Sequence, residues 1–231
     1  MGIKYTEQSR IFKSFRAIPY SDFYNLIRFY ERYEDGIADL PLDEYLVIAY
    51  YCSNALFETG EYEEYISWAN KILEYSIIHN VQYIDGEDIY LCTLRQKTFA
   101  HFKLNQIEKA TKLAHQLIKI TPASKKHSRL LRKCLRKQRP RWIDNFLVAG
   151  VGLIFIGALI SIARILLIEA FYPNLLSFIS VLEGLFWSIG IAGFVASAFG
   201  RYYYVGKHVK AVTKEAHLEL EKSEEVVLFE S

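Results

Sequence analysis

Residue types that commonly catalyse reactions or bind metals are scattered along this chain of 231 residues. Its three cysteines, Cys52, Cys92 and Cys134, stand far apart, and its six histidines fall at no metal-binding spacing. Adjacent carboxylates such as Glu63 and Glu64 are typical of a solvated helix face. No glycine-rich phosphate loop follows a strand, and no serine or cysteine nucleophile has an evident base. We therefore predict a protein that is not an enzyme, with no catalytic, cofactor-binding or metal-binding residues.

Two charged residues stand out because the sequence around them is apolar. Residues 145–163 carry no charge, and Glu183 is the single charge within residues 170–200. Arg164 directly follows the first of these segments, and such a charge is costly in a membrane unless it is paired. Three interpretations remain open for Arg164 and Glu183: an ion pair that fixes the register of two helices, separate contacts with the membrane interface, or an ion or proton path, which would require an oligomer.

Each apolar segment approaches the roughly 20 residues that a helix needs to cross a hydrocarbon core. We predict two transmembrane helices, at about residues 143–163 and 182–202, within a membrane region of residues 142–204. Lipid offers no partner for a backbone amide, so both segments should be helical, and the short connection makes them a hairpin. The alternative is a buried hairpin in a soluble bundle, but soluble helices usually carry a polar stripe that these segments lack.

Basic residues flank the apolar pair at both outer ends. Residues 125–141 include nine Lys or Arg residues and no acidic residue, and further Lys and Arg residues follow the second segment. Under the positive-inside rule, both termini of this two-span integral membrane protein should be cytoplasmic, at the inner membrane if the source is bacterial. The basic cluster consists of Lys125, Lys126, Arg129, Arg132, Lys133, Arg136, Lys137, Arg139 and Arg141.

Three roles remain open for this basic cluster: a topogenic signal that also lies against anionic lipid, docking on an acidic part of the chain, and nucleic-acid binding. Residues 19–93 carry fifteen acidic and three basic residues, a suitable docking surface. Nucleic acid is disfavoured because the cluster adjoins the membrane and has no recognition motif. We therefore expect anionic lipid, and no nucleic acid, among the partners. The apolar residues Leu130, Leu131, Cys134 and Leu135 would let this segment also cap the preceding helices.

Two segments within residues 1–124 align as helix-turn-helix units. In each, a helix ends at a turn residue, Gly60 or Asn105, and an apolar residue, Tyr62 or Ile107, follows two positions later. Small and apolar residues then recur at matching offsets along the second helix. The residues that define the two units are Gly60, Tyr62, Ala69, Asn105, Ala110, Ala114 and Pro122.

These units resemble the tetratricopeptide repeat, a family in which small residues let paired helices approach closely. The sequence departs from that pattern, since Tyr65 occupies a usual alanine position and Lys97-Thr98 replaces a typical Leu-Gly pair. The two turns also lie 45 residues apart, against about 34 in the family, so residues 76–87 should hold the excess. Other α-solenoids are the alternative. The resemblance implies a helical stack that binds a protein or peptide partner.

We therefore predict an all-α protein, a tetratricopeptide-like stack of helical hairpins followed by a transmembrane helical hairpin. Its parts are a cytoplasmic domain at residues 1–124, a basic juxtamembrane helix at 125–141, the two membrane helices, and a cytoplasmic tail at 205–231. Upstream of the repeats we expect a helix over residues 21–33, closed by Asp35-Gly36. Small residues on the membrane helices would let hairpins pack within one molecule or in a homo-oligomer; they are Gly157, Ser161, Ser188, Ala192, Ala196 and Gly200.

The function that these features favour is a membrane-anchored adaptor or scaffold, whose stack binds a protein or peptide partner at the cytoplasmic membrane face. The alternative is a small membrane-embedded assembly or transport-accessory subunit, in which the transmembrane hairpin carries the activity and the stack is regulatory. Removing the stack should abolish the first function and preserve the second.

Overall fold

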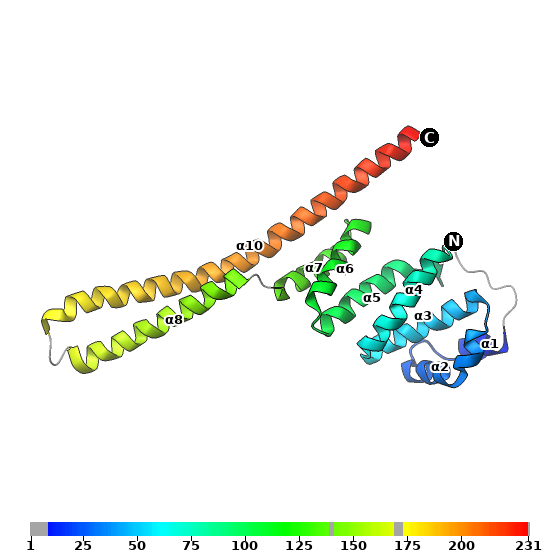
Figure 1. Ribbon diagram of the computed structural model, residues 1–231, viewed down its shortest axis with the longest axis horizontal. Helices are drawn as coiled ribbons and strands as arrows, with labels where there is room; N and C mark the ends of the chain where they lie inside the picture. The colour runs from blue at the N-terminus through cyan, green and yellow to red at the C-terminus, as the bar shows by residue number, and fades with distance from the viewer. Residues whose placement is uncertain (1–8, 139–140, 169–172, 231) are drawn as a thin grey trace. The chain divides into compact units, whose positions relative to one another are not determined.

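The computed structural model describes residues 9–138, 141–168 and 173–230; the side chains of 141–143, 167–168, 173 and 223–230 lie outside the description. Across the described residues the chain is almost entirely helical, which confirms the predicted all-α class (Figure 1). It divides into two compact units. The first runs up to Cys134 and includes the stretch from Val212 onward, and the second comprises Leu135–Ala211.

The first unit begins with a short helix that the sequence analysis did not anticipate, α1 (Arg10–Arg16). Ser9 caps this helix, because its hydroxyl oxygen accepts a hydrogen bond from the Phe12 amide at 3.1 Å. Phe12 and Phe15 are fully buried in the main core of the unit. The helix is therefore an integral part of the stack.

The next helix, α2 (Phe23–Ala38), continues past the point where the sequence predicted its end. The backbone leaves helical angles at Tyr33, where the predicted helix was to end, with φ −117° and ψ 21°. The chain then resumes the helix to Ala38, so the expectation that Asp35-Gly36 closes it is wrong. A Cβ atom on Gly36 would lie 2.7 Å from Cδ1 of Ile11. The glycine thus leaves room for the end of the Ile11 side chain and does not serve as a helix stop.

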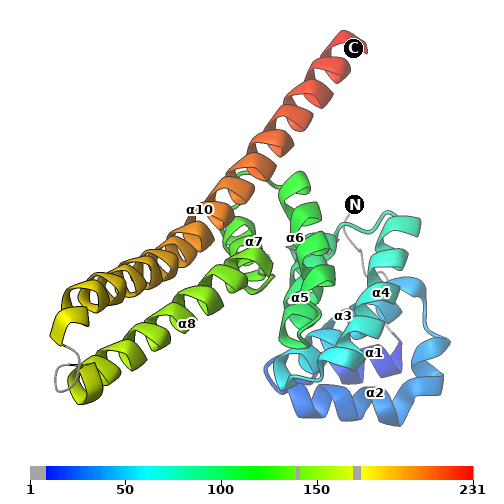
Figure 2. The ribbon, with the colours of Figure 1, turned by 60° about the vertical axis from the view of Figure 1, so that its left-hand side comes forward.

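Two helical hairpins follow (Figure 2). The first pairs α3 (Leu42–Thr59) with α4 (Tyr62–Ile78), and the second pairs α5 (Ile89–Lys103) with α6 (Ile107–Ile120). Because α4 also packs against α5, the hairpins form one continuous stack. This arrangement confirms the repeated helix packing that was predicted from the similarity between two segments of the chain.

Both hairpins turn through the same backbone motif. Gly60 has a φ of 89° and Asn105 a φ of 61°, a left-handed conformation that glycine and asparagine adopt more readily than other residues. Behind each turn, an amide reaches back to the helix: Glu61 donates to the Leu56 carbonyl, and Gln106 donates to the carbonyl of His101. This is the Schellman motif, which satisfies carbonyl groups left open at a helix end.

Small residues allow close helix packing in both hairpins, since Ala69, Ala110 and Ala114 are fully buried. Tyr65, at the usual alanine position, is also fully buried. Its hydroxyl lies 3.2 Å from the carbonyl oxygen of Thr93 and 3.1 Å from Oε1 of Gln96, both on α5. The tyrosine therefore links the first hairpin to the second through a polar contact within the core.

The connection between the hairpins accommodates the extra residues in a small β-hairpin. Strands β1 (Tyr83–Ile84) and β2 (Glu87–Asp88) pair in antiparallel fashion. Asp85 and Gly86 form the turn with φ values of 47° and 86°, and two successive positive φ values are typical of the tight turn that matches the twist of paired strands.

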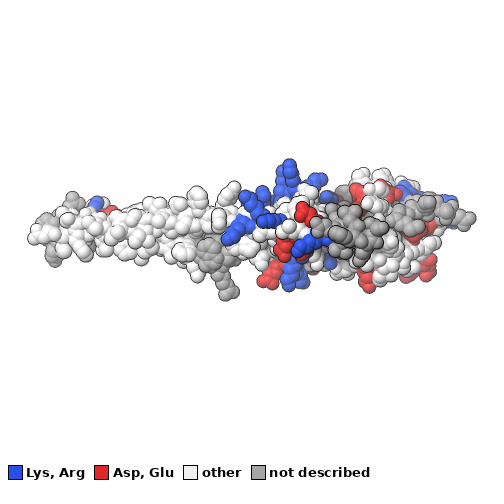
Figure 3. Space-filling view, turned by 90° about the horizontal axis from the view of Figure 1, so that it is seen from above, with Lys and Arg blue, Asp and Glu red and all other residues white. Residues whose placement is uncertain are grey.

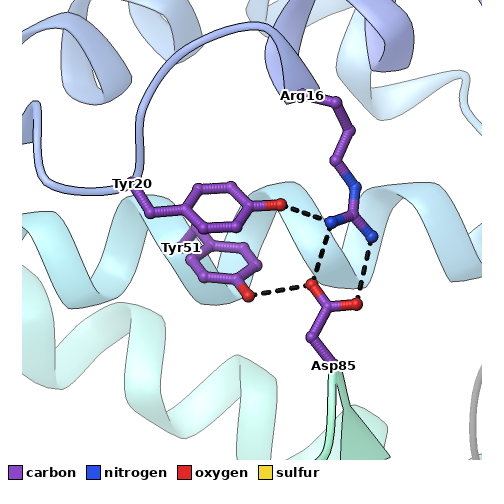
Figure 4. Close-up of polar contacts among 4 residues, drawn as sticks. All are labelled: Arg16, Tyr20, Tyr51 and Asp85. Atoms are coloured by element: carbon purple, nitrogen blue, oxygen red, sulfur yellow. Dashed lines mark hydrogen bonds and ion pairs between the residues drawn. The ribbon is translucent and has the colours of Figure 1, made fainter.

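Four polar side chains fasten this turn to the core (Figure 4). Arg16 places Nη1 and Nη2 3.0 and 3.1 Å from the two carboxylate oxygens of Asp85. The hydroxyl of Tyr51 donates to the same carboxylate at 2.9 Å, and the rings of Tyr20 and Tyr51 stack with centroids 3.8 Å apart. Burial, together with the hydrogen bond to Asp85, raises the pKa of Tyr51 well above its usual range, so its hydroxyl remains a donor.

The last helix of the stack is α7 (Lys125–Lys137). Its apolar side covers the open end of the second hairpin, with Leu131 and Cys134 fully buried. Leu130 packs against an apolar cluster formed by Leu73, Leu94 and Leu117 from three preceding helices. The basic segment is therefore part of the folded stack as well as a carrier of charge.

The second unit contains the apolar helices. Helix α8 (Arg141–Ala163) continues into a π-helical segment, η1 (Arg164–Ile168), and a 3-10 turn, η2 (Pro173–Leu175), leads into α10 (Leu176–Glu230). Among the described residues, the segments Asp144–Leu166 and Leu176–Lys222 are long and apolar enough to span a membrane. Only 11% and 6% of their apolar windows are buried within the protein, whereas the core helix of a soluble protein is mostly buried.

The second apolar helix is longer than the sequence predicted. It begins at Leu176, before the expected residue 182, and it passes without interruption through residue 205, where the tail was expected to begin. The tail and the second span are thus segments of one helix.

Glycines set the distance between α8 and α10, which lie side by side in both ribbon views (Figures 1 and 2). A Cβ atom on Gly190 would lie 2.7 Å from Cγ1 of Ile154 and 3.1 Å from the carbonyl oxygen of Gly150. A Cβ atom on Gly150 would lie 3.0 Å from the carbonyl oxygen of Gly190. Nearly all real Cβ contacts are longer, so a larger residue at either position would push the two helices apart.

Candidate functional site

A groove crosses three helices of the stack. Its volume is about 410 Å³, within the range of pockets that bind small ligands or side chains. The groove lies between the first helices of the two hairpins and the capping helix. It is lined by Phe57 and Glu58 of α3, by Arg95, Gln96 and Phe99 of α5, and by Lys126, Arg129, Leu130 and Lys133 of α7.

Two phenylalanine rings form the apolar part of the groove. The ring centroids of Phe57 and Phe99 lie 5.8 Å apart at an interplanar angle of 59°. Phe57 also contacts Tyr65, with ring centroids 5.2 Å apart. Because Tyr65 is fully buried and hydrogen-bonded, the core holds the Phe57 ring in place. Half-buried aromatic rings of this kind offer a rigid apolar contact to a ligand.

Four cationic side chains also line the groove, Arg95, Lys126, Arg129 and Lys133, and Glu58 is the acidic residue of the lining. Nζ of Lys103 lies 5.4 Å from the centroid of the Phe99 ring. Among the described residues, none of the four cations takes part in an ion pair, although Nη2 of Arg95 donates a hydrogen bond to Sγ of Cys92 at 3.5 Å. The groove is therefore a cationic surface on a stack whose charged residues between positions 19 and 93 are mostly acidic. Unpaired cations beside aromatic rings suit a ligand that combines negative charge with an apolar group.

A buried histidine next to the groove is also affected by its positive charge. His127 is 8% exposed, and its Nδ1 lies 2.6 Å from Oγ1 of Thr121. Burial lowers the pKa of His127, and the positive charges of Arg95 and Lys126 lower it further. The imidazole is therefore neutral at neutral pH, and the cations remain the source of charge at this edge of the groove.

The predicted basic cluster is exposed along α7, and only some of its residues line the groove. Lys126, Arg129 and Lys133 line the groove. Lys125, Arg132 and Arg136 are exposed and lie outside the groove lining. Lys137 is exposed as well, Arg139 falls outside the described residues, and Arg141 begins α8 with its side chain outside the description.

Charged residues are distributed very unevenly over the protein (Figure 3). Acidic residues Glu61, Glu63 and Glu64 are exposed around the turn and start of the first hairpin. In contrast, α8 and the adjoining part of α10 present an almost uncharged surface (Figure 3). Charged groups are few in the apolar segments themselves, and two of them, Arg164 and Glu183, meet.

Arg164 and Glu183 come together where α8 passes into η1. Nη1 of Arg164 lies 3.1 Å from Oε2 of Glu183, with the two side chains 34% and 15% exposed. The hydroxyl of Ser161 donates to Oε1 of the same carboxylate. Oε1 thus accepts a hydrogen bond, whereas Oε2 has a nearby cation but no aligned hydrogen bond. The ion pair fits the interpretation of a pair that fixes the hairpin register.

Five of the six predicted small residues fall into two groups, and the sixth, Gly200, is half-buried. Gly157 is buried against Trp187 and Phe186, and Ser161 contacts Glu183, so both lie within the hairpin contact. Ser188, Ala192 and Ala196 are exposed on the surface of α10. The closest backbone contacts instead involve Gly150, Gly190 and Gly193, which the sequence analysis did not single out.

The aromatic part of the groove was also missed. A usable signal was present on α7, because Lys126, Arg129 and Lys133 follow a spacing that places them on one helix face. Arg95, Phe57 and Phe99 carry no comparable signal, since stacking of separate helices brings them together. No family model, curated protein or solved structure matches this chain.

Proposed function

We propose that this protein is a membrane-anchored adaptor, in which a tetratricopeptide-like stack binds a protein or peptide partner at the cytoplasmic membrane face. The observation that carries this proposal is the groove across α3, α5 and α7. It combines unpaired cations with two phenylalanine rings on a rigid helical scaffold. Side chains with these properties are common at sites that hold partner segments.

The apolar helices supply the anchor in this proposal. Asp144–Leu166 and the first part of Leu176–Lys222 would cross the membrane, and the basic residues on both outer sides would keep the stack and the C-terminal end of α10 in the cytoplasm. The connection around Asn174 would then face the opposite side. The inner membrane is the expected location if the source is bacterial.

Cysteine labelling tests this topology. Cys52 and Cys134 are buried, and burial raises the pKa of their thiols to about 12 and about 11, so neither should react readily. With Cys92→Ser as background, a membrane-impermeant maleimide added to intact cells should label Asn174→Cys and should not label Ala123→Cys. Both introduced positions are exposed. Permeabilised cells provide the control in which both react, and labelling of Ala123→Cys in intact cells would reverse the orientation.

Affinity purification tests the adaptor role. The full chain and a fragment of residues 135–231 would each be purified from native membranes in mild detergent. We expect proteins that co-purify with the full chain and are missing from the fragment, since the groove lies entirely within the first unit. Identical sets of co-purifying proteins would reject the adaptor and favour the rival function, a membrane-embedded assembly or transport-accessory subunit.

A further inference from the structure

We infer that the groove binds an acidic peptide segment that carries an apolar or aromatic residue, and that Lys126, Arg129 and Lys133 of α7 hold this segment whereas Lys125, Arg132 and Arg136 do not. This inference names the chemistry of the partner and rests on the proposed adaptor function. It assigns the groove to a peptide, although the same basic segment also suits anionic lipid.

The spacing of the groove cations favours a linear ligand with several negative charges. Lys126, Arg129 and Lys133 lie at positions i, i+3 and i+7 of α7, which places them along one helix face. Seven residues of helix rise by about 10 Å, so the row is too long for one phosphate to contact both ends. An extended peptide advances about 3.3 Å per residue, and acidic side chains two residues apart would follow the row.

The groove residues of α3 and α5 add to the selectivity for such a peptide. Arg95 reaches the groove from α5, so cations approach a ligand from two helices. A guanidinium group can bind a carboxylate with two parallel hydrogen bonds, which favours arginine at such positions. Phe57 and Phe99 line the groove as well and would receive the apolar residue of the segment. Glu58 at the same groove disfavours an unbroken run of acidic residues.

Three cations of α7 outside the groove lining provide a matched comparison. Lys125, Arg132 and Arg136 lie at positions i, i+7 and i+11, on the side of the helix next to the groove cations, and none of them belongs to the groove lining. Both sets are exposed, so the groove lining is what distinguishes them. Removing either set of three charges changes the net charge of α7 equally. A difference in peptide affinity between the two triple variants would therefore result from where the charges lie on α7, and not from the total charge of the helix.

The experiment uses the full chain in nanodiscs of phosphatidylcholine and a fluorescein-labelled peptide with the core sequence Glu-Glu-Phe-Glu-Glu, monitored by fluorescence anisotropy. The variant K126A/R129A/K133A should weaken binding at least about tenfold, because desolvated charge contacts are lost. The variant K125A/R132A/R136A should change binding less than about twofold. Replacing the peptide's Phe by Ser should weaken binding, and replacing its Glu residues by Gln should abolish it. Circular dichroism verifies that both triple variants retain the helical fold.

Equal losses in the two triple variants, or binding that is unchanged in K126A/R129A/K133A, would overturn the inference. A second measurement separates peptide from lipid: phosphatidylglycerol that co-purifies with the protein is quantified by mass spectrometry. Loss of this lipid in K126A/R129A/K133A alone would assign the groove to lipid and reject the peptide. If the peptide fails to bind while partner proteins still co-purify with the full chain, the chemistry inferred here fails and the adaptor function stands.

Discussion

Replacing Phe15 by alanine is expected to destabilise the helical stack by about 3–5 kcal/mol, the usual cost of removing a buried phenylalanine ring. Phe15 is fully buried, and its ring contacts Phe29, Tyr20 and Tyr51 with centroids 5.7, 6.5 and 6.4 Å away. The substitution should also loosen the contact between Arg16 and Asp85, because Tyr20 and Tyr51 form part of that polar cluster.

The thiol of Cys52 reports this loss of stability within the full, membrane-embedded chain. Cys52 belongs to the same core as Phe15 and is 2% exposed, so it should react only when the stack opens. In a Cys92→Ser background, Phe15→Ala should accelerate its labelling by about a hundredfold to several thousandfold, since each 1.4 kcal/mol corresponds to a factor of ten. Lys13→Ala, at an exposed position of the same helix, is the control. Similar labelling rates in the two variants would show that α1 does not stabilise the stack.

Local patterns were sufficient to predict much of this fold. Gly60 and Asn105 can be recognised as turn residues because the left-handed conformation depends on the residue itself. The buried faces of α4 and α6 follow from the spacing of their small and apolar residues. The apolar segments can be recognised because a membrane imposes a length and a composition that few soluble helices share.

Features that depend on two distant segments could not be predicted in the same way. Gly36 carries the local signature of a helix stop, yet it lies in the part of α2 that follows the kink at Tyr33, beside Ile11 of another helix. Gly150 and Gly190 meet only in one register of α8 against α10, and sequence alone does not fix that register. The aromatic part of the groove could not be predicted either, because Phe57 and Phe99 become neighbours only when the two hairpins stack.

Arg164 and Glu183 are an intermediate case. Both residues lie near the same end of the two predicted spans, which suggested that they pair. The sequence did not exclude separate contacts with the membrane interface or an ion path. The observed contact at 3.1 Å, supported by Ser161, now gives each interpretation a distinct consequence for stability. A pair that fixes the register must show strong coupling between its two residues, whereas independent interfacial contacts must show none.

The variant Arg164→Met should therefore destabilise the hairpin by about 3–5 kcal/mol, because it leaves the Glu183 carboxylate without its charged partner in an apolar environment. The double variant Arg164→Met/Glu183→Leu should return to within about 1–2 kcal/mol of the wild type, since replacing both members of a buried pair by apolar residues is often nearly neutral. Reversible unfolding in SDS can be followed by the fluorescence of Trp187, which packs against Gly157, with Trp68 and Trp142 replaced by phenylalanine.

The same double variant separates a structural pair from a functional one. If the two residues only fix the hairpin register, R164M/E183L should retain partner co-purification as well as stability. If they form an ion or proton path, the double variant should remain stable and yet lose the activity of the protein, because no charged group would be left on the path. Additive losses of stability in the two single variants, with no recovery in the double, would contradict pairing and support independent contacts of each residue with the membrane interface.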